Sequence, residues 1–205
     1  MKWDQGWVVL ALLVAAWLVV HNSRETIASD HGLQQGSVAA GDVLLPMPEM
    51  IRRFQEPLPR MDALGDGAAE SRDALVDAFV AAVEDSSAAR LRSLRLDAAE
   101  FGWLYFPESR YTAKPYELPP ETLWMLIDQN GLKGETRLLR RFGGASLEAG
   151  GYTCEPEPRR EGPNTYWEQC TLEIRTAEGQ RTMRLFGSIM ERDGRFKFVS
   201  MANDL

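Results

Sequence analysis

The chain has 205 residues, a formal net charge of −7 at pH 7 and a hydrophobic fraction of 44%. Because affinity for nucleic acid depends on neutralised phosphates, an acidic chain with a sequence pI near 5.0 is not expected to bind nucleic acid. Both histidines, His21 and His31, precede the regularly patterned part of the chain, which therefore has no histidine to act as a general base or to bind zinc.

The first 20 residues predict a membrane segment. Trp7 to Val20 form fourteen uninterrupted apolar residues behind a short polar head. At about 1.5 Å per residue a helix of this length spans roughly 21 Å, less than the roughly 30 Å hydrocarbon core, which is typical of a signal peptide. The cleavage pattern is poor, however, and starting at Trp3 lengthens the helix to eighteen residues with tryptophan near both ends. We expect a single-pass inner-membrane anchor with the C-terminal domain in the periplasm; the alternative is secretion to the periplasm after cleavage.

Residues 21–68 predict a linker that is largely disordered, because they are rich in Gly, Pro, Ser, Asp and Gln and show no lasting apolar period. The stretch from Val43 to Phe54 is more apolar, and its prolines are expected to keep it extended or in short turns. It could contact a partner or lie on the surface of its own domain.

Regular periodicity begins at about residue 69 and predicts one domain to residue 205. Apolar residues spaced by four, with Ser71 as N-cap, predict a helix over residues 72–84. Leu91 and Leu94 mark a short second helix, and Asp97 with Glu100 matches a capping box before the aromatic residues 101–106.

A third helix is predicted from Pro120, with an interruption near Asn130 and Gly131 and a continuation to Phe142. After Gly144 the apolar period changes to two, which predicts a strand over residues 145–154, a strand of alternating residues from Cys170 and further strands to the C-terminus, with a hairpin at Asp193 and Gly194. Helices followed by an antiparallel meander indicate an α+β fold, in which the N-terminal helices pack on a curved antiparallel sheet.

Residues 70–205 resemble the nuclear-transport-factor-two-like superfamily, also called cystatin-like. The resemblance rests on the opening helix ALVDAFVAAVEDSSAARL, the proline-rich passage into the third helix, and the closing strands LFGSIMERDGRFKFVSMANDL. It implies a cone of helices on a bent sheet, with a pocket at the wide end. The superfamily includes enzymes, ligand binders and assembly modules, so the resemblance does not fix a function.

The resemblance also suggests where chemistry could occur. Dehydratase-type members use a histidine and an aspartate, and this domain lacks the histidine. Isomerase-type members need a carboxylate base and phenolic donors around an apolar pocket. The chain offers such residue types, although their spacing does not select them and an aromatic core is the simpler interpretation. The candidate pocket residues are Glu100, Trp103, Tyr105, Trp124 and Asp128, with Tyr111 and Tyr116 as further phenols.

The two cysteines, Cys154 and Cys170, fall on predicted adjacent strands on either side of a proline-rich loop. In an oxidising periplasm they are expected to form a disulfide; in a reducing compartment they would be two small buried hydrophobic residues. Two thiols without further ligands do not predict a metal site, and no phosphate-binding loop is present, so no cofactor is expected.

Basic residues cluster in two predicted helices, at Arg90, Arg92 and Arg95 and again at Arg137, Arg140 and Arg141. Solvated faces opposite a core stripe explain both clusters, and an anion or headgroup site is the alternative.

These observations favour a non-catalytic, membrane-tethered module of the bacterial envelope that binds a protein partner or a small apolar ligand. The rival hypothesis is a cofactor-free acid–base enzyme of isomerase type. A buried carboxylate hydrogen-bonded to a tyrosine beside an open apolar cavity would favour the enzyme, and an interior filled by Trp103, Trp124 and Phe106 would oppose it.

Overall fold

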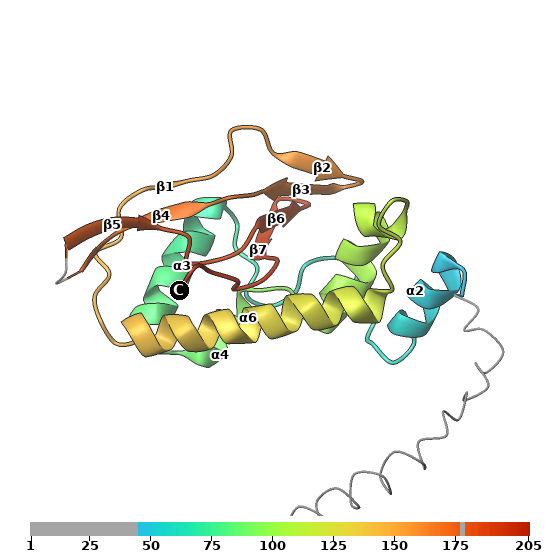
Figure 1. The fold of residues 1–205 in the computed structure, drawn as a ribbon, viewed down its shortest axis with the longest axis horizontal. Helices are drawn as coiled ribbons and strands as arrows, with labels where there is room; N and C mark the ends of the chain where they lie inside the picture. Colours follow the sequence, from blue (N-terminus) through green and yellow to red (C-terminus); the bar gives the residue numbers. More distant parts are fainter. Residues whose placement is uncertain (1–44, 177–178) are drawn as a thin grey trace, which may run out of the picture. The chain divides into compact units, whose positions relative to one another are not determined.

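The computed structural model describes residues 45–176 and 179–205, which form an α+β fold of helices and two antiparallel sheets (Figure 1). The predicted α+β class is therefore confirmed. The predicted membrane helix and residues 21–44 of the predicted linker lie outside the described residues. Among the helices that are described, none combines the length and apolar character needed to cross a membrane.

Figure 1 shows the helices on one side of the fold and the strands on the other. The helical elements are α2 (Met47–Gln55), α3 (Arg72–Glu84), α4 (Ala88–Ser93), α5 (Ala98–Glu100), the π-helical turn η1 (Phe101–Tyr105), the short turns η2 (Phe106–Glu108) and η3 (Arg110–Thr112), and α6 (Pro120–Phe142). The strands are β1 (Tyr152–Thr153), β2 (Arg159–Glu161), β3 (Asn164–Trp167), β4 (Thr171–Thr176), β5 (Gly179–Met183), β6 (Ile189–Arg192) and β7 (Arg195–Phe198).

Side-chain caps start the first helices where the sequence predicted them. The Ser71 hydroxyl accepts a hydrogen bond from the Ala74 backbone N–H at the start of α3. At the start of α5, Asp97 and Glu100 form the predicted capping box, in which each side chain accepts from the other residue's backbone N–H. Both caps satisfy backbone donors that a helix leaves free at its N-terminus.

Helix α6 runs without interruption from Pro120 to Phe142, so the predicted break near Asn130 and Gly131 is wrong. Gly131 and Gly134 both lie on the buried side of the helix, where the C-terminal segment crosses it. A Cβ at Gly134 would overlap the backbone carbonyl oxygen of Met201. Gly134 therefore permits a close approach of two backbones, and neither glycine ends the helix.

The two sheets are two halves of one antiparallel meander. Their strand orders are β1-β4-β5 and β2-β3-β6-β7. The chain passes from one sheet to the other between β1 and β2, between β3 and β4, and between β5 and β6. The strands predicted after residue 144 are therefore not continuous, because each is interrupted where the chain passes from one sheet to the other. At Asp193 and Gly194, both with positive φ, the predicted hairpin joins β6 to β7.

The core consists of two clusters of buried side chains. In the first, Phe79 of α3 packs edge to face against Phe186 and Phe198, with ring centroids 5.1 and 5.8 Å apart. In the second, Phe101 of η1 lies 5.5 Å from Phe106, which is almost fully buried. Both clusters join helices to strands and so fix the helical layer on the sheets.

Cys154 and Cys170 form a disulfide, as the predicted strand pairing suggested. The register of β1 and β4 places Tyr152 opposite Leu172 and Thr153 opposite Thr171. Continuing that register by one residue brings the two cysteines face to face at the point where the sheets separate. The disulfide therefore joins two strands just beyond their regular pairing.

Replacing both cysteines by alanine (C154A/C170A) is expected to lower the free energy of unfolding by about 3 kcal/mol, because the disulfide restricts the unfolded chain. Urea denaturation of the oxidised protein and the variant measures the difference. Reduced protein with the natural sequence serves as the control and should unfold near the midpoint of the variant. Equal midpoints for oxidised protein and variant would contradict a stabilising disulfide.

Residues 45–68, part of the predicted linker, belong to the compact unit that begins at Leu45. Residues 47–55 form helix α2 and not the extended segment that the prolines suggested. Pro46 precedes the helix and Pro48 occupies its first turn, where a missing N–H breaks no intrahelical bond. Proline there helps to start a helix, so the prediction of extended structure was wrong.

Helix α2 packs against the π-helical turn through its last residues. The rings of Phe54 and Phe101 lie 5.5 Å apart, edge to face. Gln55 Nε2 donates a hydrogen bond to the carbonyl oxygen of Gly102 at 2.9 Å. A Cβ at Gly102 would lie 3.0 Å from the Phe54 ring, so this glycine allows the ring to approach the backbone.

The outer side of α2 carries an acid held between two bases. Glu49 accepts hydrogen bonds from Nε of Arg52 at 2.8 Å and from Nε of Arg53 at 2.7 Å. These bonds lower the pKa of Glu49 from its ordinary value of 4.5 to about 2. A carboxyl group whose pKa is lower in the folded state stabilises that state only while it is ionised.

The stability that Glu49 gives α2 is therefore expected to be complete above about pH 4.5 and to be lost as the pH falls toward 2. A carboxyl-carbon NMR titration of Glu49 and amide exchange in α2 measure this. In E49Q the exchange rates of α2 should lose this pH dependence. A Glu49 midpoint near 4.5 would contradict the ion-pair geometry.

Candidate binding surface and the predicted pocket residues

Glu100, one of the two predicted acids, is fully buried and already has several hydrogen-bond donors. Its carboxylate accepts from the backbone N–H of Gly65 at 2.8 Å and of Asp97 at 3.0 Å. The ammonium group of Lys197, itself 3% exposed, lies 2.8 and 2.9 Å from its two oxygens. Glu100 is thus a well-satisfied member of a buried ion pair.

Asp128, the other predicted acid, lies on the inner side of α6 beside Arg95. Arg95 Nη2 donates to Asp128 Oδ1 at 2.8 Å, and Arg95 Nε donates to Glu135 Oε1 at 2.9 Å. Gly131 lies between the two acids along the helix, and a Cβ there would lie 3.6 Å from Nη1 of Arg95, which is ordinary contact. Arg95 therefore ties the end of α4 to α6 through two carboxylates.

The three aromatic candidates lie in and around the second core cluster. Tyr105 stacks on Phe101 with ring centroids 5.5 Å apart, and burial raises the pKa of its phenol well above the ordinary value. Trp124 lies 5.2 Å from the same Phe101 ring. Trp103 is half-buried, with the Arg60 guanidinium 5.4 Å from its ring. The three rings pack against other side chains.

The structure brings the aromatic candidates together but gives each acid a basic partner. Within the described residues, neither Glu100 nor Asp128 forms a hydrogen bond with a tyrosine. An acid–base reaction of isomerase type needs a carboxylate that can reach the substrate proton and a nearby phenol. The observed arrangement is that of a core with internal ion pairs. The sequence did not reveal the partners, because Lys197 is 97 residues from Glu100.

A polar cavity of about 320 Å³ lies where the strands of the two sheets are interrupted. Arg184 in its wall pairs with Asp204, with Nε 3.1 Å from both carboxylate oxygens, and Glu168 pairs with Arg159 at 3.2 Å. These charges are therefore neutralised within the protein. Nothing in the spacing of the lining residues predicted this cavity, since they come from five separate segments.

Apart from Tyr116, which is 49% exposed, the large apolar side chains that are exposed in the described residues lie on α6. Met125, Leu126 and Leu132 are 48, 45 and 38% exposed. Met125, Gln129, Leu132, Thr136 and Arg140 follow one another at steps of three or four residues, so they share one helix face, and all five are exposed. We call this set, with the flanking Leu126, Lys133 and Arg137, the α6 outer face.

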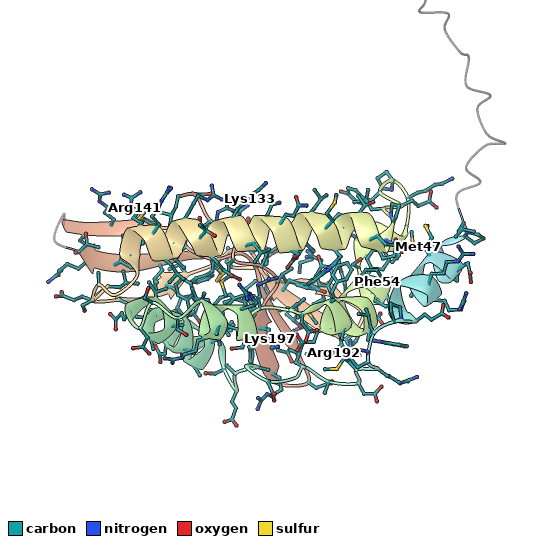
Figure 2. The ribbon with its side chains drawn as sticks, turned by 90° about the horizontal axis from the view of Figure 1, so that it is seen from below. Met47, Phe54, Lys133, Arg141, Arg192 and Lys197 are labelled. Atoms are coloured by element: carbon teal, nitrogen blue, oxygen red, sulfur yellow. A yellow bond between two sulfur atoms is a disulfide. The ribbon has the colours of Figure 1, made fainter. Side chains whose placement is uncertain are left out.

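The C-terminal half of the α6 outer face is basic. Figure 2 shows Lys133 and Arg141 projecting from the side of α6 that faces away from helices α3 and α4, whereas Lys197 lies in the interior. Arg137 Nη1 donates to the carbonyl oxygen of Leu205 at 2.9 Å. Among the described residues, Lys133 and Arg140 have no acidic partner within salt-bridge distance. This half of the helix therefore presents uncompensated positive charge.

A shallow apolar hollow of about 400 Å³ lies on the same face, lined by Leu132, Lys133, Thr136 and Arg137. The alkyl stems of Lys133 and Arg137 contribute apolar surface there while their charged ends remain in solvent. The face thus combines a small apolar surface with basic groups around it. The sequence signal that could have found it is the apolar pair Met125 and Leu132, which repeats at helical spacing opposite the core stripe.

Within the described residues, no group of three or more His, Cys, Asp or Glu side chains is arranged to hold a metal ion. Comparisons of the chain with protein-family models, with curated proteins and with solved structures give no match.

Proposed function

We propose that the protein is a non-catalytic binding or assembly module of the bacterial envelope, tethered to the inner membrane by Trp7 to Val20, with its folded unit in the periplasm. In this proposal the unit is a cone of the nuclear-transport-factor-two-like type, and its partner is an envelope protein. The observation that carries the proposal is the pairing of both candidate acids, Glu100 with Lys197 and Asp128 with Arg95.

Those pairings favour a structural role over a catalytic one. To act as a base, Glu100 would have to leave two backbone donors and a buried ammonium group, which would remain in a low-dielectric interior. Asp128 would have to release Arg95, which also binds Glu135. The isomerase alternative therefore requires the core to rearrange before any reaction.

The disulfide supports the proposed location of the folded unit in the periplasm. Disulfides persist in oxidising compartments such as the periplasm and are rare in the cytosol. Cys154 and Cys170 are the only cysteines in the sequence, and they are bonded to each other. A chain that is exported behind an apolar N-terminal segment would form this bond after translocation.

The proposal is tested with the full chain expressed in a bacterial cell. Membranes are washed with alkaline carbonate, and thiols are alkylated before and after reduction. We expect the protein to stay in the membrane pellet and to show free thiols only after reduction. A soluble protein with two free thiols would overturn the proposal.

The partner is sought by purifying the intact chain in mild detergent and comparing co-purified proteins by quantitative mass spectrometry. The matched control is residues 1–44 fused to an unrelated domain, which has the same N-terminal segment. A protein that is retained in constant ratio by the full chain and absent from the control supports the assignment. Retention by both baits would assign the contact to residues 1–44.

A further inference from the structure

We propose that the α6 outer face lies on the anionic lipid headgroups of the membrane that holds the N-terminal segment, and so orients the folded unit at the bilayer. The inference rests on the proposed function, because it requires the chain to be tethered. Beyond the proposed function, it identifies the side of the folded unit that faces the lipid and the side chains that hold this side at the headgroups.

The apolar part of the surface suits the interface between headgroups and acyl chains. Met125 and Leu132 project from the same side of α6, and Leu126 lies beside them. Helices that lie in a membrane interface bury such residues while keeping lysine and arginine at the headgroups. The hollow beside Leu132, bounded by the stems of Lys133 and Arg137, has this combination on one helix face.

The charge on α6 differs in sign from the charge of the whole protein. The exposed ionisable residues of the helix are the acid Glu121 near its start and the bases Lys133, Arg140 and Arg141 toward its end, with the half-buried Arg137 beside them. The chain as a whole carries −7. An anionic surface therefore attracts this helix and repels the rest of the protein. The contact thus selects one orientation of the unit.

The tether joins the folded unit beside α6. Residues 21–44 separate the apolar segment from Leu45, and 24 residues can span at most about 85 Å. Helix α2, which follows directly, contributes Met47, Ile51 and Phe54 to the same cluster as Trp124 and Ile127 of α6. A tether of this length keeps the folded unit within reach of the bilayer, so a contact that would be weak between separate molecules becomes effective.

A lipid surface fits α6 better than a protein groove does. The outer face lies on a single convex helix, and its bases have long side chains that can adjust to headgroups at different depths. With α6 turned toward the lipid, the sheets on the other side of the fold are directed away from the bilayer and remain available to a protein partner (Figure 1). A protein in contact with α6 is accordingly an outcome that the test must detect.

The test places the photoreactive residue benzoylphenylalanine at position 132 of the full chain, reconstituted into vesicles of phosphatidylglycerol and phosphatidylethanolamine. Irradiation followed by mass spectrometry of the protein identifies the adduct. We expect a lipid adduct, and we expect its yield to fall roughly tenfold in vesicles of phosphatidylcholine alone or after the charge reversals K133E/R140E. The same probe at Gln180, exposed on strand β5, should give little adduct.

The matched control for charge is R160E/R175E, which changes the net charge equally at exposed positions on strands β2 and β4. It should leave the adduct at position 132 unchanged. Equal yields from both double variants, no lipid adduct at 132, or a cross-link to a second copy would overturn the inference. So would a cross-link from position 132 to another protein when the same chain is irradiated in bacterial membranes. Vesicle flotation reports separately whether the chain is anchored, so failure of the tether is distinguished from failure of the lipid contact.

Discussion

Replacing Lys197 by methionine is expected to lower the free energy of unfolding by about 3 to 5 kcal/mol, because it leaves the Glu100 carboxylate buried without its counter-charge. Methionine has a similar length and fills most of the space that the lysine side chain occupies. The loss therefore comes from the missing charge and hydrogen bonds and not from a cavity. Chemical denaturation monitored by circular dichroism measures it.

Two variants separate the charge effect from a general effect of the substitution. K133M removes a lysine from the exposed α6 outer face and should change the stability by less than about 0.5 kcal/mol. E100Q/K197M removes both charges and leaves an amide oxygen for the Gly65 N–H, so it should recover part of the lost stability. A double variant that is less stable than K197M would show that the charge pair is not the cause.

The sequence predicted the local part of this site and missed the distant part. Asp97 and Glu100 are three residues apart, so their capping box follows from helix geometry alone. The partner of Glu100 comes from β7, and its position depends on how the last strand crosses the helices. Such long-range pairing has no signature in local periodicity. From local sequence alone the same acid is a candidate pocket residue, but in the structure it is part of the core.

Strand pairing was more predictable than strand length. The alternation around Cys170 and the turn residues at Asp193 and Gly194 placed β4, β6 and β7 correctly. The predicted strand over residues 145–154 is reduced to Tyr152 and Thr153, because only these residues pair regularly with β4. Alternation specifies which face a residue occupies, but it does not show where the chain passes from one sheet to the other.

Whether a glycine or a proline interrupts a helix depends on the tertiary structure around it. Pro48 was expected to prevent a helix and in fact lies in the first turn of one, which a single sequence does not distinguish. Asn130 and Gly131 predict an interruption of the helix, but α6 is continuous there and the glycine faces Arg95 and the backbone of Met201. In both cases the deciding contact comes from residues distant in sequence, since α2 packs on η1 and the C-terminal tail crosses α6.

The crossing of α6 by the C-terminal segment leads to a second prediction of a large loss of stability. Gly134→Ala is expected to lower the free energy of unfolding by about 4 kcal/mol, more than most added methyl groups cost, because the obstructing group is backbone and cannot change rotamer. The new Cβ would overlap the Met201 carbonyl oxygen and lie 2.7 Å from its carbon. The tail would have to move away from α6, which would also weaken the hydrogen bond from Asn203 Nδ2 to the Gly134 carbonyl oxygen, now 3.0 Å.

Gly131→Ala is the matched control, one turn earlier on the same side of the same helix. Its Cβ would find its nearest atoms, Nη1 of Arg95 and the Met201 nitrogen, at 3.6 Å, which is ordinary contact. Alanine favours the helix over glycine by up to about 1 kcal/mol, so this variant should be neutral or more stable. Amide exchange of residues 199–205 should rise in G134A alone. Equal stabilities for the two variants would refute the close contact between the C-terminal segment and α6 at Gly134.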